Sequence, residues 1–139
     1  MSRALQPMTE AEYLAWEERQ ERPFEFDGFR PVAMNGGTVA HGTIGTNLVF
    51  ELSLRLRGKQ CRAYGPSLKI LVAGRVRYPD AFVACSPVAN KATWLTEPVV
   101  VFEVHGDRRS NGQECRVSRH GLDQALRHAV AGEHLRRHL

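Results

Sequence analysis

Two acidic residues, Asp80 and Glu103, each stand at one end of a short apolar run, where together they could bind a metal ion. The runs 78–85 and 98–104 are rich in β-branched and aromatic residues and are bounded by turn residues, as strands are. Five residues separate Asp80 from the 86–97 loop, and five separate that loop from Glu103. In an antiparallel hairpin, this equal spacing places the carboxylates side by side, at the end away from the loop.

Such a pair of carboxylates has a definite chemical use. Adjacent ionised acids repel and raise each other's pKa unless a cation neutralises them. The pattern therefore favours a hard divalent ion bound through oxygen, with Mg²⁺ (or Mn²⁺) as the first expectation. The structural alternative is that Glu103 only ends a strand and Asp80 only serves a Pro-Asp turn. Spacing alone leaves both interpretations open.

The elements that must position this pair follow the order helix, hairpin, helix, antiparallel meander, which is typical of an α+β fold. Thr9 and Glu12 form a capping box before a short helix. Apolar residues at helical spacing predict the main packed helix over 41–57, ended by Gly58. We expect a mixed, mostly antiparallel sheet flanked by these helices. Its strands are expected at 24–26, 31–34, 61–64, 68–72, 78–85 and 98–104.

Size and composition bound the function. The chain has 139 residues, of which 42% are hydrophobic, and this suits one globular domain. Its three cysteines, Cys61, Cys85 and Cys115, are scattered, and the N-terminus lacks an apolar stretch of signal-peptide length, so we expect a cytoplasmic protein. No run approaches the roughly 20 apolar residues of a spanning helix, and no membrane partner is expected.

Charge is unevenly distributed along the chain. Residues 105–139 hold seven arginines against four acids, which leaves only +1 of the net +4 for the first 104 residues. A basic surface would favour nucleic acid held through its phosphates, but a nearly neutral body with a basic tail supports this weakly.

Several motifs occur in a fixed order over residues 8–104: 9–16, Phe24-Glu25, 31–34 with Gly36-Gly37-Thr38, His41, Tyr64-Gly65, Leu68-Lys69, 77–80 and 101–104. Together they resemble the Uma-two family of restriction endonucleases, within the PD-(D/E)xK nuclease superfamily.

The resemblance implies a restriction-endonuclease-like core and metal-dependent phosphodiester hydrolysis of DNA. By position, Asp80, Glu103 and the carbonyl of Val104 would bind the ion, and Glu25 and His41 would face the same site. A homodimer is expected, because cutting both strands commonly uses two sites.

The supporting residues also have simpler interpretations. Glu25 could be an outward residue of an edge strand, and its register is in question because the Asp27-Gly28 turn comes one position early. His41 could cap its helix. Lys69, a further catalytic candidate, alternates with apolar neighbours and could be merely solvated.

The chain departs from the family pattern directly after Glu103-Val104. The superfamily's catalytic lysine follows the Glu, but this chain has no lysine beyond Lys91. We therefore divide it into an incomplete nuclease-like domain, 1–104, and a divergent basic tail, 105–139, which is irregular or helical over 121–138. A frameshift near codon 105 would explain the change, and activity is expected to be impaired because arginine cannot take lysine's proton-transfer roles.

Two other function classes stay open. The tail could bind zinc, since Cys115 and His120 are five apart and His134 and His138 share one helix face. Alternatively, the protein could be a non-catalytic DNA-binding or interaction module that keeps the fold, which the missing lysine favours.

Overall fold

The computed structural model describes residues 7–106 and 113–118, in which the chain forms two helices and nine strands. The helices are α1 (Glu10–Glu17) and α2 (Val39–Leu56). The strands are β1 (Phe24–Phe26), β2 (Pro31–Ala33), β3 (Arg62–Tyr64), β4 (Lys69–Val72), β5 (Arg75–Arg77), β6 (Ala81–Ala84), β7 (Trp94–Leu95), β8 (Pro98–Gly106) and β9 (Gln113–Ser118).

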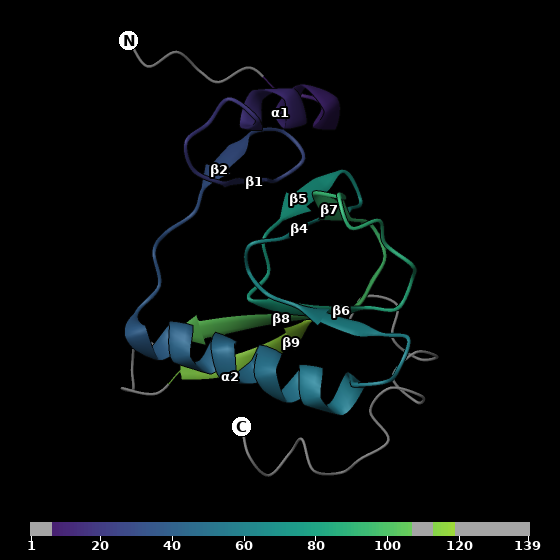
Figure 1. Ribbon diagram of the computed structural model, residues 1–139. Coiled ribbons are helices and arrows are strands. Elements are labelled where there is room, and N and C mark those ends of the chain that lie inside the picture. The colour runs from purple at the N-terminus through teal and green to yellow at the C-terminus, as the bar shows by residue number, and fades with distance from the viewer. Residues whose placement is uncertain (1–6, 107–112, 119–139) are drawn as a thin grey trace.

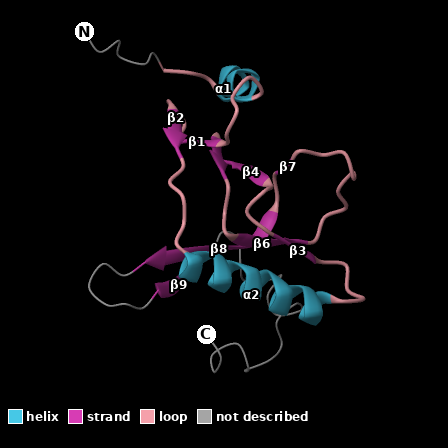
Figure 2. Cartoon of the chain, turned by 60° about the vertical axis from the view of Figure 1, so that its left-hand side comes forward, coloured by secondary structure: helices cyan, strands magenta, loops and turns pink. Residues whose placement is uncertain are grey.

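The strands form two sheets rather than one. Sheet A has the order β2-β1-β5-β4-β7 and sheet B the order β3-β6-β8-β9, and only the pairing of β4 with β7 is parallel among the described strands. Figures 1 and 2 show α1 and α2 at opposite ends of the molecule, with the sheets between them. The result is the predicted α+β fold, in four layers: α1, sheet A, sheet B and α2.

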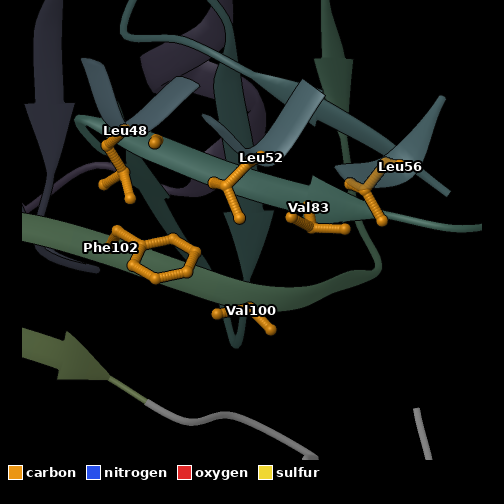
Figure 3. Close-up of a cluster of buried hydrophobic side chains, with 7 residues drawn as sticks. Leu48, Leu52, Leu56, Val83, Val100 and Phe102 are labelled. Atoms are coloured by element: carbon orange, nitrogen blue, oxygen red, sulfur yellow. The ribbon is translucent and has the colours of Figure 1, made fainter. Parts of the chain in front are cut away.

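Helix α2 covers the outer face of sheet B. Three leucines at i, i+4 spacing, Leu48, Leu52 and Leu56, are buried along one side of the helix, as its apolar periodicity predicted. They pack against Val83 of β6 and against Val100 and Phe102 of β8 (Figure 3). This cluster fixes α2 relative to the strands that carry Asp80 and Glu103.

Strand β6 lies at the centre of the molecule, and all four of its residues are buried. Ala81 and Val83 contact the α2 side, whereas Phe82 and Ala84 pack with residues of sheet A that include Ile70. Burial on both faces explains why β6 reads as a continuous apolar run rather than as an alternating one.

Helix α1 covers the other face of sheet A. Tyr13 packs on Phe26 of β1 and Val76 of β5, and its ring stacks on that of Phe26 with centroids 4.8 Å apart. The predicted capping box is present, with Thr9 accepting from the Glu12 N–H at 3.2 Å and Glu12 accepting from the Thr9 N–H at 2.7 Å.

The hairpin of β6 and β8 has the predicted antiparallel register at the end away from the 86–97 segment. Ala81 pairs with Phe102, so the next pair outward is Asp80 with Glu103. A bulge between Val83 and Ala84 shifts the pairing toward the loop. Equal spacing from the loop therefore predicted the position of the acidic pair correctly, but it did not predict the pairing of the residues next to the loop.

Several boundaries differ from the sequence prediction. The predicted strand 78–85 is only β6, which begins at Ala81, after Pro79, a residue without an N–H for a strand ladder. Between the strands predicted at 68–72 and 78–85, the structure contains a further strand, β5, which the sequence did not predict. Strand β8 continues past residue 104 to Gly106, and β9 pairs with it, so the proposed domain boundary falls within a strand. The helix expected over 121–138 lies outside the described residues.

A disulfide joins Cys61 to Cys85. The β3–β6 pairing, with Arg62 opposite Ala84, brings these two residues next to each other, although they lie 24 apart in sequence. The cysteine spacing did not predict this pair. Neither described helix is both long and apolar enough to cross a bilayer.

Candidate functional site

Asp80 is held from two directions. Its Oδ2 accepts a hydrogen bond from the main-chain N–H of Val104 at 2.7 Å, and its Oδ1 lies 2.6 Å from Nε2 of His41. The first contact comes from β8 and the second from the first turn of α2. With its side chain 17% exposed, Asp80 has a fixed orientation and partial access to solvent.

Glu103 lies beside Asp80, as the hairpin register requires. The pKa of Glu103 is raised to about 7, chiefly by burial and then by the charges of Asp80 and Glu25 and a side-chain hydrogen bond with Asp80, while the charge of Arg77 acts in the opposite direction. Two carboxylates that share a proton near neutral pH form a site that a cation would stabilise.

Glu25 belongs to the same charged group, although it lies on sheet A. Its Oε2 accepts from Nη1 of Arg77 at 2.9 Å, and its Oε1 accepts from the N–H of Tyr78 at 3.1 Å. The charge of Glu25 contributes to the raised pKa of Glu103. The early turn at Asp27-Gly28 has therefore not directed Glu25 away from the acidic pair.

The position of the site between the sheets follows from strand alternation. In sheet A, Arg77 pairs with Ile70, so the two share a face, and Ile70 packs against Phe82 of sheet B. In sheet B, Asp80 lies two residues before Phe82, on the same face. The charged side chains thus lie at the edge of the apolar contact between the sheets.

His41 is not the N-cap of α2. Thr38 takes that position and accepts the N–H of His41 at 3.1 Å, which leaves the imidazole available for Asp80. Gly37 permits this arrangement, since a Cβ at that position would lie 3.1 Å from the His41 ring. The interpretation of His41 as only a helix cap is therefore wrong.

Lys69 lies in a different polar cluster, on the α1 side of sheet A. Its Nζ is 2.7 Å from Oε2 of Glu17, and the two side chains are 13% and 6% exposed. Glu17 Oε1 also accepts from the hydroxyl of Tyr78 at 2.9 Å and from the N–H of Phe24 at 3.3 Å. Lys69 follows the alternation of β4, which places it on the face opposite Ile70.

This cluster has its own electrostatics. Burial alone would raise the pKa of Glu17, but hydrogen bonds from Lys69 and Tyr78 outweigh it, so the pKa falls below its ordinary value. Burial and the bond to Glu17 raise the pKa of Tyr78. Glu17 is therefore an ionised buried group that ties α1 to sheet A.

The ligands available to a metal are oxygen atoms. Within the described residues, no group of three or more His, Cys, Asp or Glu side chains is placed to hold an ion. The candidate set is two carboxylates, Asp80 and Glu103, with the carbonyl of Val104. Because the N–H and C=O of a strand residue point to the same edge, the Val104 carbonyl points to the edge where its N–H meets Asp80. Such a set suits Mg²⁺, which is commonly bound by one or two carboxylates, waters and substrate phosphate.

The zinc alternative falls almost entirely outside the described residues. His120, His134 and His138 are not among them, and only the backbone of Cys115, in β9, is described.

Comparison with known proteins assigns the chain to a family. A model of the Uma2 family, described as "Putative restriction endonuclease", matches residues 10–114. The chain belongs to the Uma2 family. The match includes every residue of the candidate site, and it continues past residue 104, where the sequence pattern had been taken to end.

Two individual proteins resemble this Uma2 chain. It is 36% identical over 96 residues to "Uncharacterized protein slr1290" of Synechocystis sp. (strain ATCC 27184 / PCC 6803 / Kazusa). These aligned residues cover 67% of this chain and 50% of that protein. A crystal structure from Anabaena variabilis ATCC 29413, described as "a putative nuclease belonging to DUF820", superimposes with a TM-score of 0.55 at 18% identity, over 64% of this chain and 52% of that one. The second likeness shows the fold. The chain spans about half the length of each.

Sequence reasoning missed the polar partners that hold the site together. Arg77 and Tyr78 were noted only as part of the 77–80 motif, and Glu17, which is buried, was not identified as their neighbour. A signal for Arg77 did exist: the Ala73-Gly74 turn, with positive φ at both residues, fixes the β4–β5 register and so the face on which Arg77 lies.

Proposed function

We propose that this Uma2 chain is a metal-dependent DNA endonuclease domain that hydrolyses phosphodiester bonds, with Mg²⁺ (or Mn²⁺) held by Asp80, Glu103 and the carbonyl of Val104. The observation that carries the proposal is the partly buried contact of Glu103 with Asp80, a setting in which burial first and the neighbouring carboxylate second raise the pKa of Glu103 to about 7. A carboxylate pair that is unfavourable without a cation is the expected starting state of a metal site.

The chain's own groups have distinct parts in this proposal. When bound, the ion would polarise a phosphodiester oxygen and lower the pKa of a coordinated water. Asp80 is oriented for binding by the Val104 N–H and by His41. Glu103 would have to lose its proton to hold the ion, so metal affinity should rise with pH until Glu103 is ionised in the metal-free protein as well. Glu25 orients Arg77 and Tyr78 next to the site.

The rate is expected to be low. No lysine follows Lys91 in the sequence, and Lys69 is paired with Glu17 on the far side of sheet A. A group that could exchange a proton with the attacking water or with the leaving oxygen is therefore missing from the lysine position of the superfamily pattern.

Plasmid nicking tests the proposal. Supercoiled DNA should be nicked slowly with Mg²⁺ and not with EDTA, and Asp80→Asn and Glu103→Gln should each abolish the nicking. Glu21→Gln, which removes an exposed carboxylate on the loop before β1, is the matched control and should behave as wild type. Metal-independent nicking, or full nicking by Asp80→Asn, would refute the assignment.

The second candidate is a non-catalytic DNA-binding module with the same fold, favoured by the engagement of Lys69 with Glu17. It predicts DNA retention that responds neither to Mg²⁺ nor to Asp80→Asn. We further propose a homodimer, because two sites are needed to cut both strands. Sedimentation of the full chain with and without a DNA duplex tests the dimer.

A further inference from the structure

Among the side chains that the structure describes, Arg77 is the guanidinium placed against the acidic group of the site. Its guanidinium lies 2.9 Å from Glu25, and it is close enough to Glu103 to oppose the rise in that residue's pKa. Its side chain is 38% exposed. Neither the sequence pattern nor the family description assigns it a role.

We propose that Arg77 is a catalytic residue of this site, which contacts a non-bridging oxygen of the DNA phosphate and stabilises the charge that develops there. The proposal rests on the proposed function and adds a phosphate-binding group to it. Arg77 acts as a fixed positive charge, and it forms and breaks no covalent bond.

The register of sheet A directs Arg77 toward the site. It pairs with Ile70 on β4, and Ile70 faces sheet B. On its other side, β5 pairs with β1 through Val76 and Phe26, so Arg77 lies across from Glu25. Arg77 therefore extends from the same face as Glu25, toward the sheet that carries Asp80 and Glu103.

The geometry leaves Arg77 free to bind a second anion. A guanidinium has five N–H donors, and the described contact with Glu25 uses Nη1. Glu25 itself is fixed by the Tyr78 N–H, so it acts as a rigid support for the guanidinium. A supported and partly exposed guanidinium is the arrangement in which arginine binds phosphate well.

Two other basic side chains that the structure describes, Lys69 and His41, are each already paired with a carboxylate. Lys69 is paired with Glu17 on the opposite face of sheet A, with its side chain only 13% exposed. His41 is bonded to Asp80. Three carboxylates, from Glu25, Asp80 and Glu103, would repel a phosphate, so a positive group that is still accessible is needed to admit the substrate. Arg77 meets that need.

The test compares Arg77→Met and Arg77→Gln with wild type in the full chain. Binding of a fluorescein-labelled DNA duplex is measured by anisotropy in EDTA across a range of salt concentrations. Loss of one phosphate contact should reduce the slope of log K against log salt by about one. Single-turnover nicking in Mg²⁺ should fall at least 50-fold. Arg30→Met is the matched control, because it removes an arginine that is also paired with a carboxylate, Asp27, but is 68% exposed.

The outcomes are separable. Wild-type salt slopes and nicking rates in both Arg77 variants would overturn the assignment of Arg77 while leaving the proposed function intact. If wild type binds DNA but does not nick it, the proposed function fails, and the salt slope alone decides whether Arg77 contacts phosphate. If Arg77→Met does not fold, Arg77→Gln, which keeps a donor for Glu25, decides. Wild type that binds no DNA at low salt overturns both.

Discussion

Replacing Glu103 by Gln should stabilise the metal-free protein at alkaline pH, although it removes a group of the site. A rise of the Glu103 pKa from its ordinary 4.5 to about 7 means that the folded state holds a proton which the unfolded state has released. Stability is therefore lost as the pH rises from about 4.5 to about 7, and it levels off above that range. Glutamine cannot ionise, so Glu103→Gln avoids this loss.

The magnitude follows from the same values. At about 1.4 kcal/mol for each pKa unit, the rise to about 7 corresponds to ~3 kcal/mol, and partial solvent screening reduces the expectation to about 2 kcal/mol. Urea unfolding in EDTA at pH 5 and pH 8 measures it. Wild type should lose about 2 kcal/mol more than Glu103→Gln between the two conditions.

A metal should reverse this difference. Saturating Mg²⁺ at about 100 times its dissociation constant should stabilise wild type at pH 8 by about 2.7 kcal/mol, and Glu103→Gln by much less. Equal pH dependence of wild type and variant would show that Glu103 is not perturbed, and the argument for a cation site would then fail.

Three further changes test the surroundings of the site. His41→Ala removes the contact that orients Asp80 and should slow single-turnover nicking about 10-fold while the melting temperature changes little, as measured by nicking and thermal scans. Lys69→Met leaves the buried Glu17 without its cationic partner, so the free energy of unfolding in urea should fall by about 3 kcal/mol. Slowed nicking with unchanged stability would instead assign Lys69 to catalysis. Leu52→Ala opens a cavity between α2 and sheet B, at a cost of about 2–5 kcal/mol in urea unfolding, and an unchanged midpoint would contradict the packing described.

The acidic pair was predictable because a hairpin is a local structure. The distances of Asp80 and Glu103 from one loop fix their pairing, and the sequence contains both. The same counting failed beyond Val83, where the bulge changes the register. The capping residue Thr9 was predictable for the same reason, since its partner lies three residues away.

Long-range partners were not predictable in this way. Alternation along 68–70 showed that Lys69 points away from Ile70, but not that both faces of sheet A are covered. The lysine that could have been merely solvated is therefore partly buried and paired with Glu17. The contact of Arg77 with Glu25 joins residues 52 apart in sequence. It depends on the pairing of β1 with β5, and no local pattern reports that pairing.

The chain passes from sheet A to sheet B through only three residues, because β5 ends at Arg77 and β6 begins at Ala81. Each of the three residues has a fixed place. The Tyr78 N–H donates to Glu25, and the Pro79 ring is buried in the interior. The Asp80 carboxylate accepts from the Val104 N–H and contacts His41. Inserting or deleting a single amino acid in this crossing should thus displace Asp80 from Glu103 and from Glu25, and should abolish the proposed hydrolysis. By contrast, the exposed residues 89–93 lie between β6 and β7, at the opposite end of the hairpin, and there the length of the chain can vary without changing the acidic pair.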